Sequence, residues 1–395
     1  MAEAMPKVWV TNGRQKKLIL GHPWVYGNEI DRVEGEAADG GLAEVVDFRG
    51  RTVGMGVYNS RSLLRVRLLT DRSETVTDEL IAERVRAACR YREIVLSRPG
   101  TDCCRLIYGE ADRLPGVICD RYGGVVVLQI LSLGMERFTQ VIADTLTECE
   151  KPSCLLLKND DPIRDKEGMA SFSRVLSGTM PDEVIVHENG IALAMDPAGG
   201  QKTGGFLDQK DNHLFVRQFC RGGRVLDCFS YAGGFALNAA AAGAAEVTAV
   251  DISEAAVALI RRNAQLNGLA VGAVCANCFD YLREQVRLKE RYDVIVLDPP
   301  AFTKAKANMA SACRGYKEIA LSAMRLLPAG GVLATHSCSY HMPEETFVNT
   351  VISAAQDLHR HVRIITLRRQ DIDHPVLAGY PESHYLKSLW LQMME

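Results

Sequence analysis

Residues 224–251 constrain the fold of this chain more than any other stretch. In order, they hold a short apolar run closed by Asp227, the pair Gly233-Gly234, an alanine-rich run over 235–245, and a second apolar run over 247–250 closed by Asp251. Short apolar runs of this kind are typical of strands buried on both faces, and a glycine pair lets the backbone turn tightly against a ligand. The stretch therefore predicts a strand–turn–helix–strand unit with an acid at the end of each strand.

The acid that ends the second strand indicates what this unit binds. Ligands of such units lie outside the carboxyl ends of the strands, where Asp251 can accept both hydroxyls of a ribose. The G-x-G-x-x-G fingerprint of dinucleotide-binding proteins is missing, and no P-loop lysine follows Gly234. A nucleoside with a small charged group suits the site better, which favours S-adenosylmethionine. The alternative is a glycine turn in an ordinary α/β sheet.

Length and composition narrow the class of protein. The 395 residues are enough for two or three domains, and 47% hydrophobic with 24% charged residues is typical of soluble globular proteins. No apolar run has the character of a signal peptide or the length of a membrane span. The 12 irregularly spaced cysteines favour the reducing cytoplasm. Because the net charge is −3, any nucleic acid must be bound by local basic surfaces.

The first seventy residues read as short strands separated by turns, which predicts a small β-rich domain with a barrel architecture. Trp24 and Tyr26 stand among basic residues there, and Arg61, Arg65 and Arg67 cluster near the end of the domain. Two interpretations are open. The aromatic and basic side chains can hold RNA by stacking and phosphate contact, or Trp24 is a core residue beside solvated arginines.

The middle of the chain predicts a second, modest α/β domain. A helical pattern covers 78–96, strands are expected over 125–131 and 154–158, and a helix is expected around 137–148. The glycine-rich segment 196–212 follows. So many glycines indicate a loop whose backbone closely approaches a ligand, and we expect it to fold over the cofactor pocket; the alternative is a flexible linker.

The carboxyl-terminal part predicts a doubly wound sheet, because strands alternate with helices and polar residues follow the strands. The residues expected at the strand ends are Asp227, Asp251, Asn277, Asp298 and Cys338. Since these strand ends meet at one edge, a binding site is expected there. The segment 303–317 contains Lys304, Lys306, Arg314 and Lys317 but no acid, and we interpret it as a basic loop that contacts RNA.

Cys338 carries the sharpest chemical signal. A thiol at a strand end can act as a nucleophile if its pKa is lowered there. Attack of a thiolate on carbon-6 of a pyrimidine turns carbon-5 into a nucleophile toward a sulfonium methyl group. The alternative is a small buried residue, which free cysteine usually is. Cys275 and Cys278 form a C-x-x-C, but the chain has no second such pair, and no metal is expected.

Several motifs resemble one family, the bacterial large-subunit ribosomal RNA cytosine-5 methyltransferases of the RlmI type. In chain order, the matching pieces are Gly21-His22-Pro23-Trp24-Val25, Glu110-Ala111-Asp112-Arg113-Leu114-Pro115-Gly116, Lys202-Thr203-Gly204-Gly205-Phe206-Leu207-Asp208-Gln209, Asp227-Cys228-Phe229-Ser230-Tyr231, Asp298-Pro299-Pro300-Ala301-Phe302, Cys313-Arg314-Gly315-Tyr316-Lys317 and Ser337-Cys338-Ser339. The resemblance implies a PUA-like RNA-binding domain over 1–72, a central α/β domain over 73–190 and a Rossmann-like class I methyltransferase domain over 191–395.

The resemblance also implies roles for single residues. Cys338 would be the covalent nucleophile, and Asp298 would hold the edge of the pyrimidine. The residues expected to contact S-adenosylmethionine are Phe206, Asp208, Gln209, Asp227, Phe229, Tyr231, Gly233, Asp251, Asn277, Cys278, Asp298 and Pro299. Those expected to contact the RNA are Pro300, Phe302, Lys304, Arg314 and Lys317. The chain departs from the pattern at Asn277, where many methyltransferases have an aspartate, and at Tyr340-His341 after the Ser337-Cys338-Ser339 motif.

Three functions compete. The first is formation of 5-methylcytosine in 23S ribosomal RNA, either as naked RNA or as an early assembly intermediate, by a cytoplasmic enzyme that can also be a homodimer. The second is methylation of a guanine nitrogen or of a small molecule without a covalent intermediate, in which Cys338 is structural. The third is RNA binding without turnover.

Overall fold

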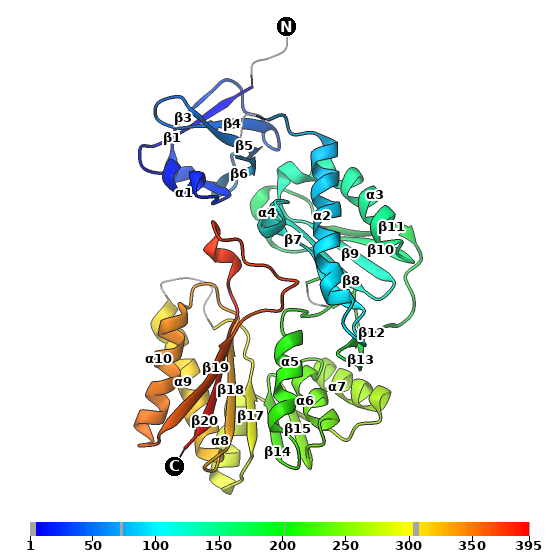
Figure 1. Ribbon diagram of the computed structural model, residues 1–395, viewed down its shortest axis with the longest axis vertical. Coiled ribbons are helices and arrows are strands. Elements are labelled where there is room, and N and C mark those ends of the chain that lie inside the picture. The colour runs from blue at the N-terminus through cyan, green and yellow to red at the C-terminus, as the bar shows by residue number, and fades with distance from the viewer. Residues whose placement is uncertain (1–4, 72–73, 201, 303–307, 395) are drawn as a thin grey trace. The chain divides into compact units, whose positions relative to one another are not determined.

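The computed structural model describes residues 5–71, 74–200, 202–302 and 308–394 (Figure 1). The chain divides into two compact units. Unit 1 comprises Met1–Val186, Met195–Leu207 and Ile372–Ser383, and unit 2 comprises His187–Ala194, Asp208–Asp371 and His384–Glu395. Within the described ranges, no helix is both long and apolar enough to cross a membrane. The borders expected after residues 72 and 190 stay predictions.

The amino-terminal part of unit 1 is a small β domain. Its sheet has six strands in the order β2-β6-β5-β4-β1-β3, with β1 parallel to β4 and the other neighbours antiparallel. The elements are β1 (Lys7–Val10), α1 (Gln15–Ile19), β2 (Trp24–Tyr26), β3 (Ile30–Glu34), β4 (Leu42–Val46), β5 (Thr52–Tyr58) and β6 (Leu64–Thr70). Alternating valines such as Val8 and Val10 on β1 point into its core, as the period of two predicts.

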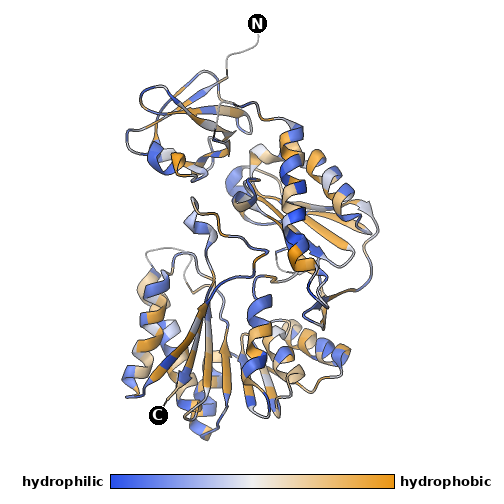
Figure 2. Ribbon diagram, in the orientation of Figure 1, coloured by the Kyte–Doolittle hydropathy of each residue, from blue (hydrophilic) through white to orange (hydrophobic). Residues whose placement is uncertain are grey.

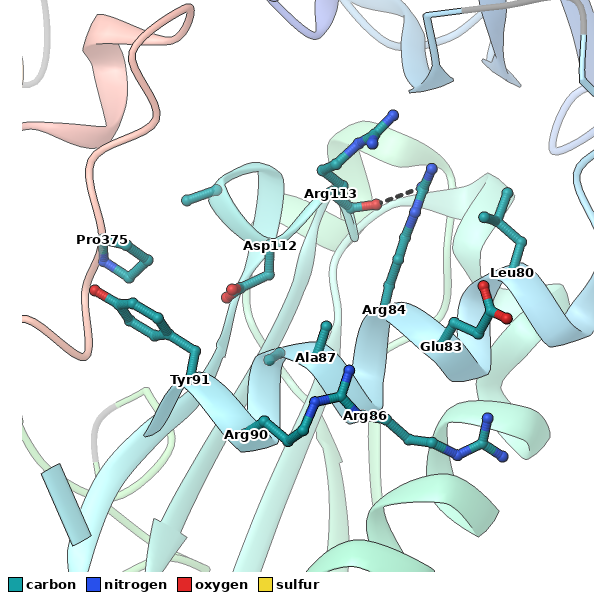
Figure 3. Close-up of a pocket in the computed structure, with 12 residues that line it drawn as sticks. Leu80, Glu83, Arg84, Arg86, Ala87, Arg90, Tyr91, Asp112, Arg113 and Pro375 are labelled. Atoms are coloured by element: carbon teal, nitrogen blue, oxygen red, sulfur yellow. Dashed lines mark hydrogen bonds between the residues drawn. The ribbon is translucent and has the colours of Figure 1, made fainter. Parts of the chain in front are cut away.

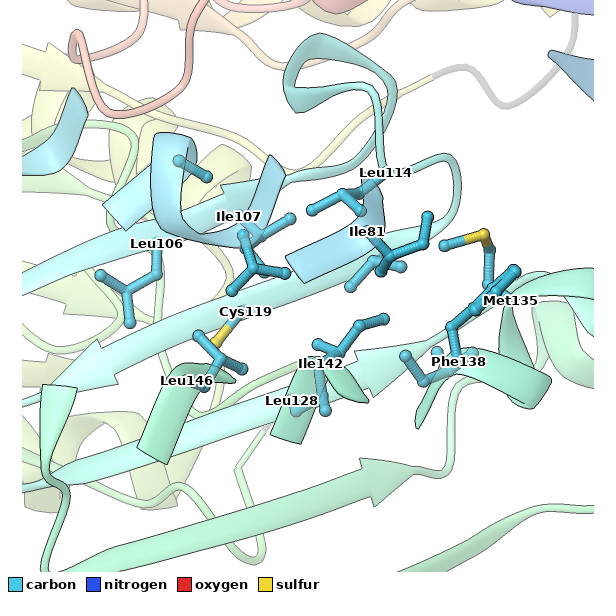
Figure 4. Packing of buried hydrophobic residues seen from close by; sticks show 14 of the residues in the cluster. Ile81, Leu106, Ile107, Leu114, Cys119, Leu128, Met135, Phe138, Ile142 and Leu146 are labelled. Atoms are coloured by element: carbon cyan, nitrogen blue, oxygen red, sulfur yellow. The ribbon is translucent and has the colours of Figure 1, made fainter. Parts of the chain in front are cut away.

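The rest of unit 1 is an α/β domain, and its sheet runs β11-β10-β9-β8-β7. Its elements are α2 (Asp78–Leu96), β7 (Cys103–Tyr108), η2 (Gly109–Asp112), β8 (Val117–Tyr122), β9 (Val125–Ile130), η3 (Leu133–Phe138), α3 (Thr139–Glu150), β10 (Cys154–Asn159), α4 (Ile163–Glu167) and β11 (Phe172–Gly178). Helix α2 begins where Thr77 Oγ1 accepts the N–H of Leu80 at 3.2 Å. Figure 4 shows its apolar face, with Ile81, packed over β7–β9.

Unit 2 is built on a seven-stranded sheet in the order β16-β15-β14-β17-β18-β20-β19. Only β20 runs against its neighbours. The strands are β14 (Arg224–Cys228), β15 (Glu246–Asp251), β16 (Gly272–Cys275), β17 (Val294–Leu297), β18 (Val332–Ser337), β19 (Val362–Arg368) and β20 (Lys387–Met393). Successive connections turn in opposite directions on either side of β14 and β17, so the sheet has its topological switch point between these two strands.

Helices flank this sheet. They are α5 (Lys210–Val216), α6 (Gly234–Ala241), α7 (Glu254–Asn267), α8 (Cys278–Leu288), α9 (Met309–Leu326) and α10 (Glu344–Asp357). Figure 2 shows strands such as β17 as hydrophobic along their length and the helices as two-sided. This contrast is expected of a parallel sheet covered on both faces. The doubly wound architecture predicted from the sequence is therefore confirmed.

Three details differ from the sequence predictions. Helix α6 ends at Ala241, earlier than the expected 245. The basic segment was expected to be a loop as far as Lys317, but α9 begins at Met309, so Arg314 and Lys317 are helical. The connection between β19 and β20 was not assigned, and it contributes Ile372–Ser383 to unit 1. A hairpin of β12 (Val184–Glu188) and β13 (Ile191–Met195) leads from the central domain.

Candidate functional site

Asp227 occupies the centre of the carboxyl-end edge of the sheet in unit 2. It is the fourth residue of β14, and its side chain is fully buried. Its Oδ2 accepts hydrogen bonds from Ser230 Oγ at 2.5 Å and from the Ala236 N–H at 3.0 Å. Its Oδ1 has no hydrogen-bond partner within the described part of the chain. A buried oxygen without a partner is costly in a structural core, and it suits a group that receives a ligand.

The loop after β14 holds strained backbone at the place where the ligand is expected. Phe229 and Tyr231 have φ values of 64° and 48°, and Gly233 has a φ of 87°. Only glycine adopts such angles without strain, and aromatic residues rarely do. Strain of this kind is found at ligand sites, where the surrounding structure holds it. The loop therefore presents its backbone in a fixed shape beside Asp227.

Gly234 is required by its neighbour His213. A Cβ at this position would lie 2.3 Å from His213 Cε1. His213 cannot easily move, because its Nδ1 is 2.6 Å from Glu188 Oε1 and its ring packs edge-on against Phe235. Burial lowers the pKa of His213, but Glu188, together with the charges of Asp298 and Asp227, outweighs burial and the net pKa is raised. The glycine pair therefore has two roles, since Gly233 makes the turn and Gly234 admits the imidazole.

Asp251 ends β15, as predicted, and lies half-buried. Its Oδ2 accepts the Tyr231 N–H at 3.0 Å, and its Oδ1 accepts the Ser253 N–H at 2.9 Å. Each carboxylate oxygen has a second lone pair, so both can still accept a ribose hydroxyl. The two backbone donors hold the carboxylate in one orientation toward the strained loop.

Asn277 and Cys278, the two residues expected near an adenine, also stabilise the local structure. Asn277 is the N-cap of α8, and its Oδ1 accepts the N–H groups of Phe279 and Asp280 at 2.9 and 3.4 Å. Cys278 is buried, and its Sγ accepts the Phe229 N–H at 3.2 Å. Cys278 therefore supports the strained loop, while the other cysteine of the C-x-x-C, Cys275, is exposed.

Asp298 follows β17 across the switch point from Asp227. Its Oδ2 accepts a hydrogen bond from Gln209 Nε2 at 3.0 Å, so the structure brings these two predicted residues together. Burial, and then the like charge of nearby Asp208, raise the pKa of Asp298 to about 7. Burial also raises the pKa of Asp227 to about 6. Asp208 is buried as well, and its Oδ2 accepts the hydroxyl of Tyr385.

This group of acids fits a cationic ligand. Burial and mutual repulsion raise the pKa values of these carboxyl groups by destabilising their ionised forms. A positive charge that enters the site stabilises the ionised forms again. S-adenosylmethionine carries a sulfonium and an ammonium group, and its ribose suits Asp251. The residues present therefore fit the cofactor.

Cys338 directly follows β18 and is half-buried. Its Sγ lies 3.9 Å from the carbonyl oxygen of Pro299, the residue after Asp298. Strands β17 and β18 are parallel neighbours, with Leu297 paired to Thr335, so the thiol and the Asp298 carboxyl occupy the same edge. The geometry thus brings Cys338 and Asp298 together as the sequence predicted.

Sequence reasoning missed Lys387, the first residue of β20. It is buried, and its Nζ donates to the carbonyl oxygens of Ser339 at 2.6 Å and Tyr385 at 2.7 Å. No carboxylate in the described ranges lies within ion-pair distance of it. Burial lowers the pKa of Lys387 to about 8, although nearby Cys338 acts in the opposite direction. The available signal was a lysine at the start of a strand rich in apolar residues, since buried lysines are rare.

The residues predicted to contact RNA differ in their exposure and in their partners. Phe302 packs on Tyr316, with ring centroids 4.7 Å apart, and Pro300 is exposed beside it. Arg314 is exposed on α9, whereas Lys317 pairs with Asp357 at 2.9 Å. Lys304 and Lys306 lie outside the described residues.

The glycine-rich segment is divided between the units. Phe206 belongs to unit 1, as does Thr203, which donates to Asp120 and lies 3.0 Å from the Tyr122 hydroxyl. Asp208 and Gln209 belong to unit 2. The expectation that the whole segment folds over the cofactor pocket therefore has support only around Asp208 and Gln209, where Gln209 contacts Asp298.

Trp24 follows neither of the interpretations made from the sequence. Its Nε1 donates a hydrogen bond to Glu110 at 2.8 Å, and its ring packs against the ring of Tyr380 with the centroids 4.7 Å apart. Arg67, expected among the phosphate contacts, is buried between Glu110 and Glu167 at 3.1 and 3.0 Å. These residues join the β domain to the rest of unit 1, so they are poorly placed to stack on RNA.

The strand order, the switch point and the acidic edge define a class I methyltransferase domain. The family of S-adenosylmethionine-dependent methyltransferases matches residues 163–369, and a PUA-like domain matches residues 8–71. The chain is 38% identical over 394 residues to a ribosomal RNA large subunit methyltransferase I from Salmonella enteritidis, with 98% of each chain covered. It therefore belongs to the ribosomal RNA large subunit methyltransferase I family, and its cofactor is S-adenosylmethionine.

Solved structures agree on the fold. A SAM-dependent methyltransferase from Streptococcus mutans is 20% identical with a TM-score of 0.84, and 98% of this chain and 99% of that chain are covered. A methyltransferase crystallised in complex with SAH is likewise 20% identical, with a TM-score of 0.85 and the same coverage. At this identity the likeness concerns the fold alone, which is the three-part architecture predicted from the sequence.

Proposed function

We propose that the protein forms 5-methylcytosine in 23S ribosomal RNA through a covalent bond between Cys338 and the target cytosine. The curated relative from Salmonella is named for large-subunit ribosomal RNA, which supports the substrate class. The observation that carries the base and the chemistry is a half-buried thiol on the same strand edge as Asp298. A methyltransferase acting on a nitrogen has no need of a thiol there.

The cofactor is held by unit 2 in this proposal. Asp251 accepts the ribose hydroxyls, the loop at Phe229 and Tyr231 contacts the nucleoside, and the acids around Asp227 face the positive charges. When bound, S-adenosylmethionine supplies an electrophilic methyl group. The pocket residues position the target base next to that group and exclude water from it.

The thiol of Cys338 performs the covalent steps. Its thiolate forms a bond to carbon-6 of the cytosine, and the electron pair displaced from the carbon-5/carbon-6 double bond makes carbon-5 the nucleophile. After carbon-5 is methylated, its proton passes to a water molecule, the electron pair of the C–H bond re-forms the double bond, and the bond between Sγ and carbon-6 breaks to release the thiolate. The enzyme is thereby regenerated, and no second cysteine is required. Because a stacked base cannot reach a recessed thiol, the target is single-stranded or flipped out.

Lys387 and Asp298 hold protons for these steps. With a pKa of about 8, Lys387 exists in both protonation states near neutrality. Its neutral amine can take the thiol proton, and the resulting ammonium is the counter-charge of the thiolate. Asp298, whose pKa is about 7 before the cofactor's positive charges enter, contacts the pyrimidine edge and can exchange a proton there, as donor or acceptor of a hydrogen bond.

The substrate is naked 23S RNA or an early assembly intermediate in the cytoplasm, bound by a monomer or by a homodimer. The test is to map methylated nucleotides in ribosomal RNA from a strain with and without the gene. The proposal predicts that one 5-methylcytosine of 23S RNA disappears in the deletion strain and returns with the wild-type gene. Loss of a methylguanine instead would favour nitrogen methylation, with Cys338 structural.

A further inference from the structure

We propose that unit 1 carries a separate site for the RNA backbone, the α2 cleft, which lies between helix α2 and the η2 turn and is lined by Arg84, Arg86, Arg90, Tyr91 and Arg113. This inference rests on the proposed function, because it takes RNA as the substrate. It concerns a part of the chain that contributes nothing to the methyltransferase sheet.

The cleft has a volume of about 700 Å³, and Pro375 is among the residues that line it. Figure 3 shows the arginines of α2 on one wall and Arg113, from the turn after η2, on the other. Arg86 and Arg90 are one helical turn apart, so their side chains leave the same face of α2 about 6 Å apart along its axis. The cleft is thus a basic groove with charges on both walls.

The acids near the cleft do not neutralise it. The carboxylate of Asp112 already accepts two hydrogen bonds from the guanidinium of buried Arg92, at 2.6 and 2.7 Å. Glu79 lies 2.9 Å from Arg86 and satisfies that one arginine. Glu83 is the remaining acid that lines the cleft. Glu148 also lies 3.6 Å from Arg86, and Glu74 and Asp71 act on Arg84 in the direction opposite to Arg113. Among the residues that line the cleft itself, four arginines outnumber two acids, Glu83 and Asp112.

Two arginines remain available for a ligand. Arg90 is exposed, and the described ranges give it no hydrogen bond or ion pair. The Arg113 side chain is 53% exposed, and within the described part of the chain its one ion pair is a 3.7 Å contact to Asp71, whose side chain is 69% exposed. Surface ion pairs of this kind contribute little to stability, so the arginine can readily exchange its carboxylate partner for a phosphate group.

Arg113 is also held in place by a buried arginine. It has a φ of 60°, an uncommon angle for a residue with a side chain. Arg84 supports this strained backbone, because its guanidinium donates to the carbonyl oxygens of Arg113 at 2.8 Å and Leu69 at 2.5 Å (Figure 3). Burial and then the charge of Arg113 lower the pKa of Arg84 to about 10. An anion in the cleft would relieve this repulsion between cations.

Tyr91 suits a nucleic acid better than a simple anion. Its hydroxyl donates to the Ile372 carbonyl at 3.0 Å, which anchors the ring, yet the residue is 45% exposed. An anchored, exposed aromatic ring beside guanidinium groups is the combination that binds single-stranded RNA by stacking and phosphate contact. It also gives a use to Asp112 and Arg113 in the Glu110–Gly116 motif, which the catalytic unit leaves unexplained.

The experiment measures binding of a fluorescein-labelled, single-stranded 20-nucleotide RNA to the full chain at several salt concentrations. The variant Arg90→Ala/Arg113→Ala should bind about 10-fold more weakly at 0.1 M salt. The slope of log affinity against log salt should fall by about 1.4, since each single-strand phosphate contact contributes about 0.7. The control Arg221→Ala/Arg363→Ala removes the same charge from exposed positions of unit 2 and should leave the slope unchanged. S-adenosylmethionine affinity should be equal in all three proteins, which checks the fold.

The outcomes separate this inference from the function on which it rests. If the wild type binds RNA but the cleft variant keeps its affinity and slope, the cleft is not an RNA site and the inference is overturned, whereas the proposed function stands. If the wild type itself does not bind RNA, the proposed function fails as well. Arg90→Glu provides a second test, because reversing the charge must weaken binding more than removing it.

Discussion

Replacing Asp298 with asparagine should stabilise the cofactor-free protein at high pH while abolishing its activity. The wild-type carboxyl has a pKa of about 7 in the folded protein, against an ordinary value of 3.8. Between these values the native state keeps a proton that the unfolded chain has released. The free energy of unfolding therefore falls as the pH rises toward 7, and the loss is complete above that pH. Asparagine does not titrate, so the variant escapes this loss.

The magnitude follows from the part of the titration that lies between pH 5 and pH 8. Two pKa units remain between pH 5 and the folded pKa of about 7. At 1.36 kcal/mol per unit they amount to about 2.7 kcal/mol, and partial access of solvent reduces this to about 2 kcal/mol. The stability gap between Asp298→Asn and the wild type should therefore widen by about 2 kcal/mol from pH 5 to pH 8.

Urea unfolding of both proteins, followed by circular dichroism at the two pH values, measures this gap. The control is Asp182→Asn, which removes the same charge at an exposed position between β11 and β12. Its gap to the wild type should be the same at both pH values. A gap for Asp298→Asn that does not change with pH would refute the assignment of a raised pKa to this carboxyl, and with it the proposed exchange of a proton there.

Further predictions concern single contacts. Gly234→Ala should lower the free energy of unfolding, measured with a chemical denaturant, by about 1–3 kcal/mol, because its Cβ would lie 2.3 Å from His213 Cε1. An unchanged free energy of unfolding would mean that the imidazole moves freely. Asp251→Ala should weaken S-adenosylmethionine binding by about 2–4 kcal/mol in calorimetry, and equal affinity would remove the ribose contact from this acid. Lys387→Met should raise the pH midpoint for alkylation of Cys338 by iodoacetamide by about 1 unit, and an unmoved midpoint would leave the lysine without a role at the thiol.

The sequence was a good guide wherever pattern and chemistry are local. The apolar runs that end in Asp227, Asp251 and Asp298 predict both the sheet and the edge that carries the site. Helix α7 begins after Ser253, whose Oγ accepts the Ala256 N–H at 3.3 Å, as the N-cap signal predicts.

The errors fall where distant segments meet. Lys387 is separated from Cys338 by 49 positions, and only the antiparallel pairing of β18 with β20 brings them to one place. The sequence left two interpretations of Trp24 open, because its partners, Glu110 and Tyr380, come from other parts of unit 1. The start of α9 was placed too late because cationic residues and a glycine obscure the apolar period of 3.6 residues that continues through Tyr316. Tertiary contacts of this kind leave no trace in a local pattern.

The central claim is that Cys338 forms a covalent bond to a cytosine, and trapping with RNA that contains 5-fluorocytosine tests it most directly. Fluorine replaces the proton that must leave carbon-5, so the enzyme stays attached to the methylated RNA. With S-adenosylmethionine present, the wild type should give a denaturant-stable adduct whose peptide mass maps to Cys338. Cys313→Ala, which removes another half-buried thiol, should give the same adduct, and Cys338→Ala should give none while still binding the cofactor. An alanine variant at this position that methylates cytosine at a near-normal rate would contradict the account.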